Sequence, residues 1–271
     1  MRLASKSDTR LDQKQGKMTR MLAAGVRGGW MRSLWAAALL AAAWQCRAEG
    51  TFGGSLALTS DYVFRGLSQT CGKPAAQADV HYRISSPSAG ESFLGVWGSQ
   101  ELSGEYCPTP GELNLYAGHS WLTGLASSLT LTYAHYAYPG SAEGHYDYDE
   151  FEGAWAFQDR LFVTVAWVPN ALGYTNYSAS RDRNAVSLGL QLNQPIASAF
   201  TATVGVGYDQ IADVTGAGFV FWSAGIAYGR GPAQIGVSYF GTSDRARHLY
   251  GGMGGNRWAA TVIWRFGLGA K

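Results

Sequence analysis

Hydrophobic and polar residues alternate along most of the chain after Thr51. The clearest run covers residues 185–193, where the apolar positions are Val186, Leu188, Leu190 and Leu192. A period of two places apolar and polar side chains on opposite faces of a strand. These runs lack the three- and four-residue spacing of an amphipathic helix. The pattern therefore predicts an all-β chain.

Twelve runs of this kind, about ten residues each, follow one another. They cover residues 54–64, 75–85, 92–101, 111–121, 127–138, 147–157, 160–168, 183–193, 198–209, 218–228, 233–242 and 256–266. Connections after even-numbered runs are short, and those after odd-numbered runs are longer and more polar. An even strand number with short turns at one end and long loops at the other predicts a transmembrane antiparallel up-and-down β-barrel, with the short turns and both termini on the periplasmic side.

The position of the aromatic residues separates this fold from a soluble β-sandwich, whose core rings prefer mid-strand positions. Here the rings gather at the ends of the runs, as in membrane-interface girdles. Next to the long connections these are Tyr62, Phe64, Tyr136, Tyr138, Tyr146, Tyr148, Trp167, Tyr208, Phe219, Phe221, Tyr239, Phe240 and Trp258. At the opposite ends they are Trp121, Trp155, Phe157, Tyr228, Trp264 and Phe266. The distribution favours the barrel. Because hydrocarbon tolerates no open sheet edge, the last run is expected to pair with the first.

Composition agrees with a membrane barrel. Charged residues make up 15% of the 271 residues, against about 25% in a typical soluble domain. Glycine is frequent, with 36 residues, and the chain holds 10 Trp, 15 Tyr and 11 Phe. Outside residues 1–48 no run of about 18 apolar residues occurs, which argues against a helical membrane protein. The aromatic content excludes a disordered chain.

Residues 1–48 are interpreted as a leader and residues 49–271 as the barrel. Met31-Arg32-Ser33 precedes a short apolar stretch at 34–44, and the small residues Cys46 and Ala48 occupy positions −3 and −1 of a cleavage site. This is a secretory signal peptide, whose true start is expected at Met18, Met21 or Met31. The alternative is a buried Ala-rich helix.

Export changes how charge and cysteine are interpreted. The leader holds nine of the 21 basic and two of the 19 acidic residues, so the remainder carries 12 basic and 17 acidic residues, a net charge of −5. The overall +2 is therefore no evidence for nucleic-acid binding. Cys71 and Cys107 fall in predicted loops on the same side, and an oxidising compartment permits a disulfide between them. The alternative is two independent small residues.

The segment Leu56-Ala57-Leu58-Thr59-Ser60-Asp61-Tyr62-Val63-Phe64-Arg65-Gly66-Leu67-Ser68-Gln69-Thr70 resembles the opening block of the TorF family of porins. Three later segments, at 94–99, 112–118 and 138–140, are similar to further blocks of that family. The resemblance covers most of the exported chain and implies a bacterial outer-membrane protein with no catalytic residues. Cys71 and Cys107 are not part of the family pattern. Near the end, Trp264-Arg265-Phe266 resembles the aromatic final strand that the barrel assembly machinery recognises, although five residues follow Phe266.

If the apolar faces meet lipid, the other faces line the lumen. This makes candidates of Asp61, Asp79, His81, Arg83, Glu112, Glu150, Glu152, Arg257 and Arg265. Such charges either line a conducting pore or pair with each other and plug the barrel. Further charges are expected in loops at the outer mouth: Glu101, Glu105, Arg181, Arg183, Arg245 and Arg247.

The two signs of charge are segregated. Runs three to six and their outer loops hold eight acidic residues: Glu101, Glu105, Glu112, Glu143, Asp147, Asp149, Glu150 and Glu152. Runs seven, eight, eleven and twelve and their loops hold Arg181, Arg183, Arg245, Arg247 and Arg257. We hypothesise an acidic wall facing a basic one, a field that would orient dipolar solutes and tune ion selectivity. Ordinary solvated loop charges are the alternative.

Motifs for other chemistry are weak. No Gly-x-Ser-x-Gly elbow is present, and the His and Cys residues show no metal-ligand spacing, so neither a metal nor a cofactor is expected. An outer-membrane lipase would need Ser and His on the lipid face, and His119 and His135 fall near opposite ends of neighbouring runs. His119 is interpreted as a girdle residue. The sequence therefore predicts a passive channel for small hydrophilic solutes in the bacterial outer membrane. A non-conducting barrel with a structural or surface-binding role is the alternative.

Overall fold

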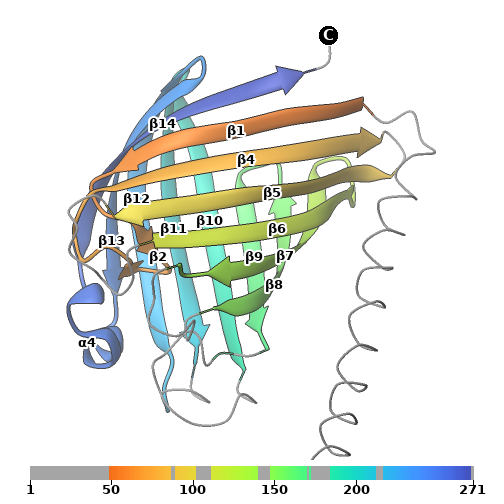
Figure 1. Ribbon diagram of the computed structural model, residues 1–271. Coiled ribbons are helices and arrows are strands. Elements are labelled where there is room, and N and C mark those ends of the chain that lie inside the picture. Colours follow the sequence, from red (N-terminus) through yellow and green to blue (C-terminus); the bar gives the residue numbers. More distant parts are fainter. Residues whose placement is uncertain are drawn as a thin grey trace, which may run out of the picture. The chain divides into compact units, whose positions relative to one another are not determined.

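The computed structural model describes residues 49–86, 89–101, 111–139, 147–169, 171, 184–211 and 216–269. Within these residues twelve strands form one closed barrel in which each strand pairs antiparallel with its sequence neighbours (Figure 1). The barrel strands are β1 (Glu49–Thr59), β4 (Ala75–Ser86), β5 (Gly90–Glu101), β6 (Gly111–Leu122), β7 (Ser127–Ala137), β8 (Tyr148–Phe157), β9 (Leu161–Val168), β10 (Ala185–Ala197), β11 (Phe200–Gln210), β12 (Phe219–Arg230), β13 (Ala233–Thr242) and β14 (Arg257–Gly269).

The predicted closure of the ring is confirmed. β14 pairs antiparallel with β1 from Thr51↔Gly269 to Thr59↔Thr261. This pairing satisfies the edges that the first and last strands would otherwise expose to lipid. The fold is therefore the predicted up-and-down transmembrane barrel. No helix among the described residues is long and apolar enough to cross a membrane.

One prediction about the wall is wrong. The first strand was expected over residues 54–64, but β1 ends at Thr59 and the chain then leaves the wall. Residues 63–64 form the short strand β2 (Val63–Phe64), which pairs with β3 (Leu67–Ser68) in a separate two-stranded sheet. The alternation of residue types continues past Thr59, so the pattern alone does not show where the wall ends. We call residues 60–74 the inward segment.

The barrel has two unlike ends. At one end the strands are joined by short turns, such as Gly231-Pro232 between β12 and β13; we call it the short-turn end. The other end carries the helix α4 (Asp244–Tyr250) and the 3₁₀ turn η4 (Gly251–Met253) between β13 and β14, and we call it the α4 end (Figure 1). The inward segment, which connects β1 to β4, belongs to the α4 end.

The outer surface of the wall is apolar. Large hydrophobic side chains at every second strand position are about half exposed, among them Leu56, Leu94, Leu115, Val165, Leu190, Val204, Ile226, Val237 and Val262. A contiguous apolar surface of this extent is stable only against lipid. The outward rings Trp167, Tyr208 and Trp258 lie near the α4 end, and Trp121, Trp155, Phe157, Tyr228, Trp264 and Phe266 near the short-turn end. For these rings the predicted girdles are confirmed.

Several rings assigned to the outer girdle are not on the lipid face. Tyr148 and Phe219 are 3% and 1% exposed, and Tyr136 stacks on Tyr148 with ring centroids 4.4 Å apart. Tyr62 and Phe64 belong to the inward segment, where Tyr62 contacts Trp97. The sequence pattern misassigned them because a ring near a strand end can face either side of the wall. They pack inside the barrel instead.

Candidate functional site

The strand residues predicted to line the lumen lie on the inner face of the wall. Val80, between Asp79 and His81, is 53% exposed, and Phe151, between Glu150 and Glu152, is 46% exposed. Since neighbours in a strand point to opposite faces, the charged residues face inward. By the same alternation with exposed neighbours the inner face also holds Glu112, Arg257 and Arg265, and Arg83 shares it because it follows His81 by two residues on β4.

The inward segment folds as a tight hairpin. Between β2 and β3, Arg65 and Gly66 have φ of 48° and 77°, the backbone of a two-residue type I′ turn, which favours glycine. A Cβ on Gly66 would lie 2.8 Å from Cβ of Phe221 in β12 and 2.7 Å from Cγ2 of Thr242 in β13. The hairpin starts from β1, its tip touches β12 and β13, and Arg65 at the tip contacts Glu150 on β8, five strands from β1 around the ring, so it crosses the lumen.

Asp61 fixes the base of the hairpin, not a position in the wall. It is 4% exposed, and its carboxylate accepts hydrogen bonds from Ser68 Oγ at 2.5 Å and Thr70 Oγ1 at 3.0 Å. Arg257 on β14 approaches the same carboxylate, with Nη1 3.3 Å from Oδ2. Arg257 Nη2 also donates to the carbonyl oxygen of Met253 at 2.6 Å. One acid thus joins the inward segment to the last strand and to η4.

Arg65 fixes the tip of the hairpin to the acidic side of the lumen. Its Nη2 lies 2.7 Å from Glu150 Oε2, and the two side chains are 11% and 3% exposed. The guanidinium also lies 4.6 Å from the ring centroid of Phe64. The inward segment therefore places an arginine on the acidic wall and an aspartate on Arg257. The sequence predicted that Glu150 and Arg257 would face each other across an open lumen. In the structure each is instead paired with a residue of the inward segment, Glu150 with Arg65 and Arg257 with Asp61.

Tyr62 makes a third contact with the acidic wall. Its hydroxyl donates toward the Glu112 carboxylate, 3.4 Å from both oxygens. Asn114 Nδ2 donates to the same carboxylate at 2.7 Å. Burial and the nearby Glu112 charge raise the pKa of Tyr62 well above its usual value, so the phenol stays protonated and remains a donor.

Asp79, His81, Arg83 and Arg265, four further residues predicted to line the lumen, pair with other wall residues rather than with the inward segment and form separate groups. Asp79 accepts from Tyr116 at 2.6 Å and contacts His81 Nδ1 at 2.5 Å. Arg83 pairs with Glu91 at 3.3 Å, and both are partly exposed. Arg265 donates to Gln234 at 2.8 Å near the short-turn end. These groups lie on the wall and not in one cluster.

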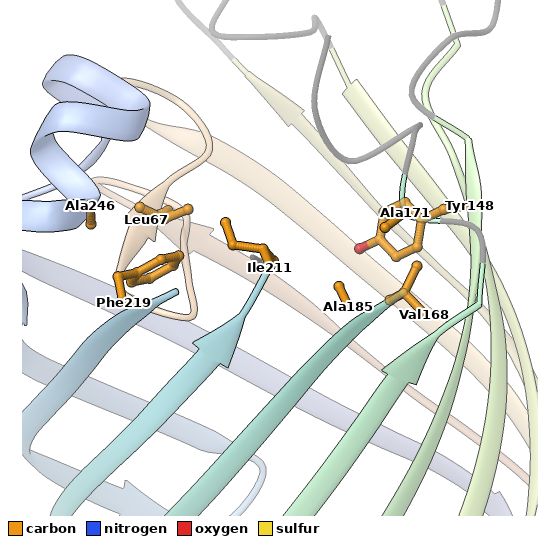
Figure 2. Close-up of a cluster of buried hydrophobic side chains, with 8 residues drawn as sticks. All are labelled: Leu67, Tyr148, Val168, Ala171, Ala185, Ile211, Phe219 and Ala246. Atoms are coloured by element: carbon orange, nitrogen blue, oxygen red, sulfur yellow. The ribbon is translucent and has the colours of Figure 1, made fainter. Parts of the chain in front are cut away.

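An apolar cluster fills part of the α4 end. It consists of Leu67, Tyr148, Val168, Ala171, Ala185, Ile211, Phe219 and Ala246 (Figure 2). Leu67 comes from the hairpin and Ala246 from α4, and the others come from the ends of β8 to β12 or just beyond them. Burial of these side chains stabilises the position of the hairpin and excludes water from this part of the α4 end.

Two cavities flank the hairpin inside the barrel, and Val63 contributes to both. One, of about 350 Å³, is lined by Tyr62 and Trp97 with residues of β1, β4 and β11 to β14. The other, of about 440 Å³, is lined by Arg65, Glu152 and residues of β9 to β12. The lumen is thus partly filled at the α4 end and retains space beside the hairpin.

The expected mouth residues fall in different places. Arg247 and Arg245 lie in α4, where Arg247 approaches Asp244 at 3.5 Å. Glu101 ends β5. Glu105, Arg181, Arg183 and Cys107 lie outside the described residues, so the loop charges and the Cys71–Cys107 bridge stay predictions. No group of three or more His, Cys, Asp or Glu within the described ranges is arranged to hold a metal ion.

Two histidines lie on the outer face near opposite ends, as expected. His119 Nδ1 is 2.8 Å from Ser92 Oγ, its Nε2 is 2.7 Å from the carbonyl oxygen of Ala89, and its ring contacts Trp121. His135 lies 2.9 Å from Asp149. His119 therefore has a serine partner but no carboxylate partner among the described residues, whereas His135 has the carboxylate partner. A complete Ser-His-acid arrangement is not formed by these residues.

The residue that sequence reasoning missed is Arg65. The signal was the pair Arg65-Gly66 between Val63-Phe64 and Leu67-Ser68, which is the spacing of a two-residue hairpin. It was hidden because residues 63–64 continue the alternation of β1. The inward orientation of Tyr62 and Tyr136 was also missed, because a ring near a strand end can face either side of the wall.

Breaking the buried ion pair should destabilise the barrel. Arg65→Met leaves the Glu150 carboxylate buried without its guanidinium, and we expect the free energy of unfolding to fall by about 3 kcal/mol. Arg65→Met combined with Glu150→Gln should recover part of that loss. Arg83→Met is the matched control, since its pair with Glu91 is partly exposed and such pairs contribute about 0–1 kcal/mol. Urea unfolding in lipid vesicles measures all of these; equal losses for Arg65→Met and Arg83→Met would contradict the prediction.

Comparison with solved structures finds similar barrels. A chain from a study of in-meso crystallisation of membrane proteins matches with a TM-score of 0.55 at 12% identity, covering 80% of this chain and 84% of that one. The KdgM porin in complex with oligogalacturonate matches with a TM-score of 0.45 at 8% identity, covering 80% and 99%. The NanC porin gives a TM-score of 0.43 at 9% identity, covering 83% and 100%. At such identities the likeness concerns the fold alone.

Comparison with curated proteins finds no match. A family model does match, over residues 44–269, which is most of the chain and all of the barrel. The description of that family assigns no function, so the site has to be interpreted from its own geometry. The chain belongs to the Gcw_chp family, described as bacterial proteins of unknown function.

Proposed function

We propose that the protein is a passive channel of the bacterial outer membrane for small hydrophilic solutes, narrowed at the α4 end by the inward segment. The observation that carries the proposal is the polar inner face beside the hairpin. Around the two cavities it presents Gln77, Thr203, Gln234, Ser238 and Thr261 on one side, and Thr164, Ser187, Gln191 and Ser223 on the other. Uncharged polar side chains of this kind suit the passage of hydrated solutes, a function that needs no catalytic residue.

The proposal includes the orientation and the partners. The short-turn end would face the periplasm and the α4 end the exterior, as in other outer-membrane barrels. Residues 1–48 would be removed as the leader, β14 would be recognised by the barrel assembly machinery, and outer-membrane lipids would surround the apolar belt. Such a protein would be a porin of the TorF type, the family that the opening segment resembles. We also propose the Cys71–Cys107 bridge, which would tie the base of the inward segment to the connection after β5.

A second candidate is a non-conducting barrel with a structural or surface-binding role. The observation in its favour is the hairpin itself, because two ion pairs and the apolar cluster hold it across the lumen. A barrel of twelve strands is narrow enough for such a segment to reduce the open area substantially. The two candidates predict opposite results with neutral solutes.

Liposome swelling separates them. Vesicles containing the purified protein should swell in isosmotic arabinose or glucose faster than empty vesicles, and more slowly in a larger trisaccharide, because the hairpin limits the open area. The folded state is checked on the same sample by its β-sheet circular dichroism. Swelling no faster than in empty vesicles for every sugar, with the barrel folded, would reject the channel and favour the non-conducting barrel.

A further inference from the structure

One carboxylate on the acidic wall makes no hydrogen bond and no ion pair among the described residues. Glu112 is engaged by Tyr62 and Asn114, and Glu150 by Arg65. Glu152, two residues further along the inner face of β8, forms no hydrogen bond and no ion pair within the described part of the chain. Its cross-strand neighbours are Thr132 on β7 and Ala166 on β9. Glu152 therefore adds a carboxylate that makes no direct ion pair, with the Arg65 guanidinium as the nearby positive charge.

This carboxylate faces a cavity of defined composition. The cavity beside the hairpin, about 440 Å³ in volume, is lined by Glu152 together with the aromatic residues Phe64, Phe162 and Phe221. Thr164, Ser187 and Ser223 add hydroxyl groups. Arg65 also borders it, but its charge is paired with Glu150 at 2.7 Å. The site combines one carboxylate that makes no direct ion pair with apolar rings and hydroxyls.

We propose that this cavity is a binding station for small organic ammonium solutes. The ammonium group would pair with Glu152, a charge-assisted contact that is stronger than a neutral hydrogen bond. The carbon skeleton would pack against Phe162 and Phe221, whose ring faces also attract cations. A volume of about 440 Å³ accommodates an amino sugar or an amino alcohol, whereas a bare inorganic ion would leave the rings without a role. This inference rests on the proposed channel and names a solute class for it.

The charge balance of the inner face supports a cation over an anion. Three acidic residues, Glu112, Glu150 and Glu152, lie on β6 and β8, and the arginine that pairs with this group among the described residues, Arg65, is bound to Glu150. Arg257 is turned away toward Asp61 and the backbone of η4. An anion entering the cavity would meet an unpaired carboxylate. A cation would neutralise it.

The test compares solutes of one size and different charge. Reversal potentials in planar bilayers give the permeability of glucosamine in its ammonium form, of potassium and of gluconate, and liposome swelling gives that of glucose. For Glu152→Gln we expect the preference for glucosamine over gluconate to fall about two- to fivefold, the effect of one unit charge at short range in water. Glucose swelling should not change. Phe162→Leu should lower the glucosamine preference and leave the potassium preference unchanged.

Glu91→Gln is the matched control, because it removes one carboxylate from the inner face outside this cavity. If it lowers the glucosamine preference as much as Glu152→Gln does, the effect belongs to the general charge of the lumen and the binding station is rejected. Equal losses for potassium and glucosamine in Glu152→Gln would also reject it. If the wild-type protein passes neither glucose nor glucosamine, the channel itself fails, which is a separate result.

Discussion

Replacing Val63–Ser68 with two glycines is expected to raise the single-channel conductance several-fold. The replacement removes the part of the inward segment that crosses the lumen, including Arg65 and Leu67. In the native protein Gln69 N donates to the carbonyl oxygen of Tyr62 at 2.7 Å. A Tyr62-Gly-Gly-Gln69 sequence closes the same hydrogen bond as a four-residue turn, so the shortened connection keeps its ends in place.

The barrel wall should survive this change. β2 and β3 pair with each other, whereas β1 pairs with β4 and β14 along its length. Conductance in planar bilayers and swelling in a trisaccharide measure the gain. Inserting two glycines between Gly231 and Pro232, at the short-turn end, is the control and should leave the conductance at the wild-type value. A folded variant whose conductance equals that of the wild type would show that the hairpin does not limit passage.

A charge placed on the outer face should lower the free energy of unfolding far more than the same charge on the inner face. Leu190 is 47% exposed on the apolar belt of β10, and its neighbour Gln191 lines the larger of the two cavities beside the hairpin. We expect Leu190→Arg to lower the free energy of unfolding by about 2–4 kcal/mol, the cost of an arginine among acyl chains near the middle of the bilayer.

Gln191→Arg is the matched control, since it introduces the same side chain one residue away on the water-filled side. It should change the free energy of unfolding by less than about 1 kcal/mol while shifting ion selectivity toward anions. Urea titration in lipid vesicles, followed by tryptophan fluorescence, measures both variants. Equal destabilisation of the two would contradict the assignment of lipid-facing and lumen-facing sides on which the channel proposal depends.

The sequence predicted the wall well because one physical rule governs all of it. A strand with lipid on one side and water on the other must alternate, so positions such as Leu188 and Val204 reveal their side directly. The pairing of the last strand with the first also followed, since an unpaired edge is costly in hydrocarbon. Positions of this kind depend only on the local residue pattern.

The interior was harder to predict because it depends on contacts between distant residues. Nothing local shows that Asp61 meets Arg257, 196 positions away, or that Arg65 meets Glu150. A continued alternation at residues 60–64 is compatible with a longer first strand or with a hairpin. The hairpin is favoured by Ser68 and Thr70, whose hydroxyls donate hydrogen bonds to the Asp61 carboxylate once the chain has left the wall. For the same reason the rings of Tyr148 and Phe219 were assigned to the wrong side.

The location of Arg257 links the final step of folding to the position of the hairpin. Arg257 is the first residue of β14, and β14 is the strand that joins β1 to complete the ring. Asp61 follows β1 directly, so its arginine arrives only when the two ends of the chain come together. The strand that completes the barrel thus also supplies the arginine that holds the base of the hairpin.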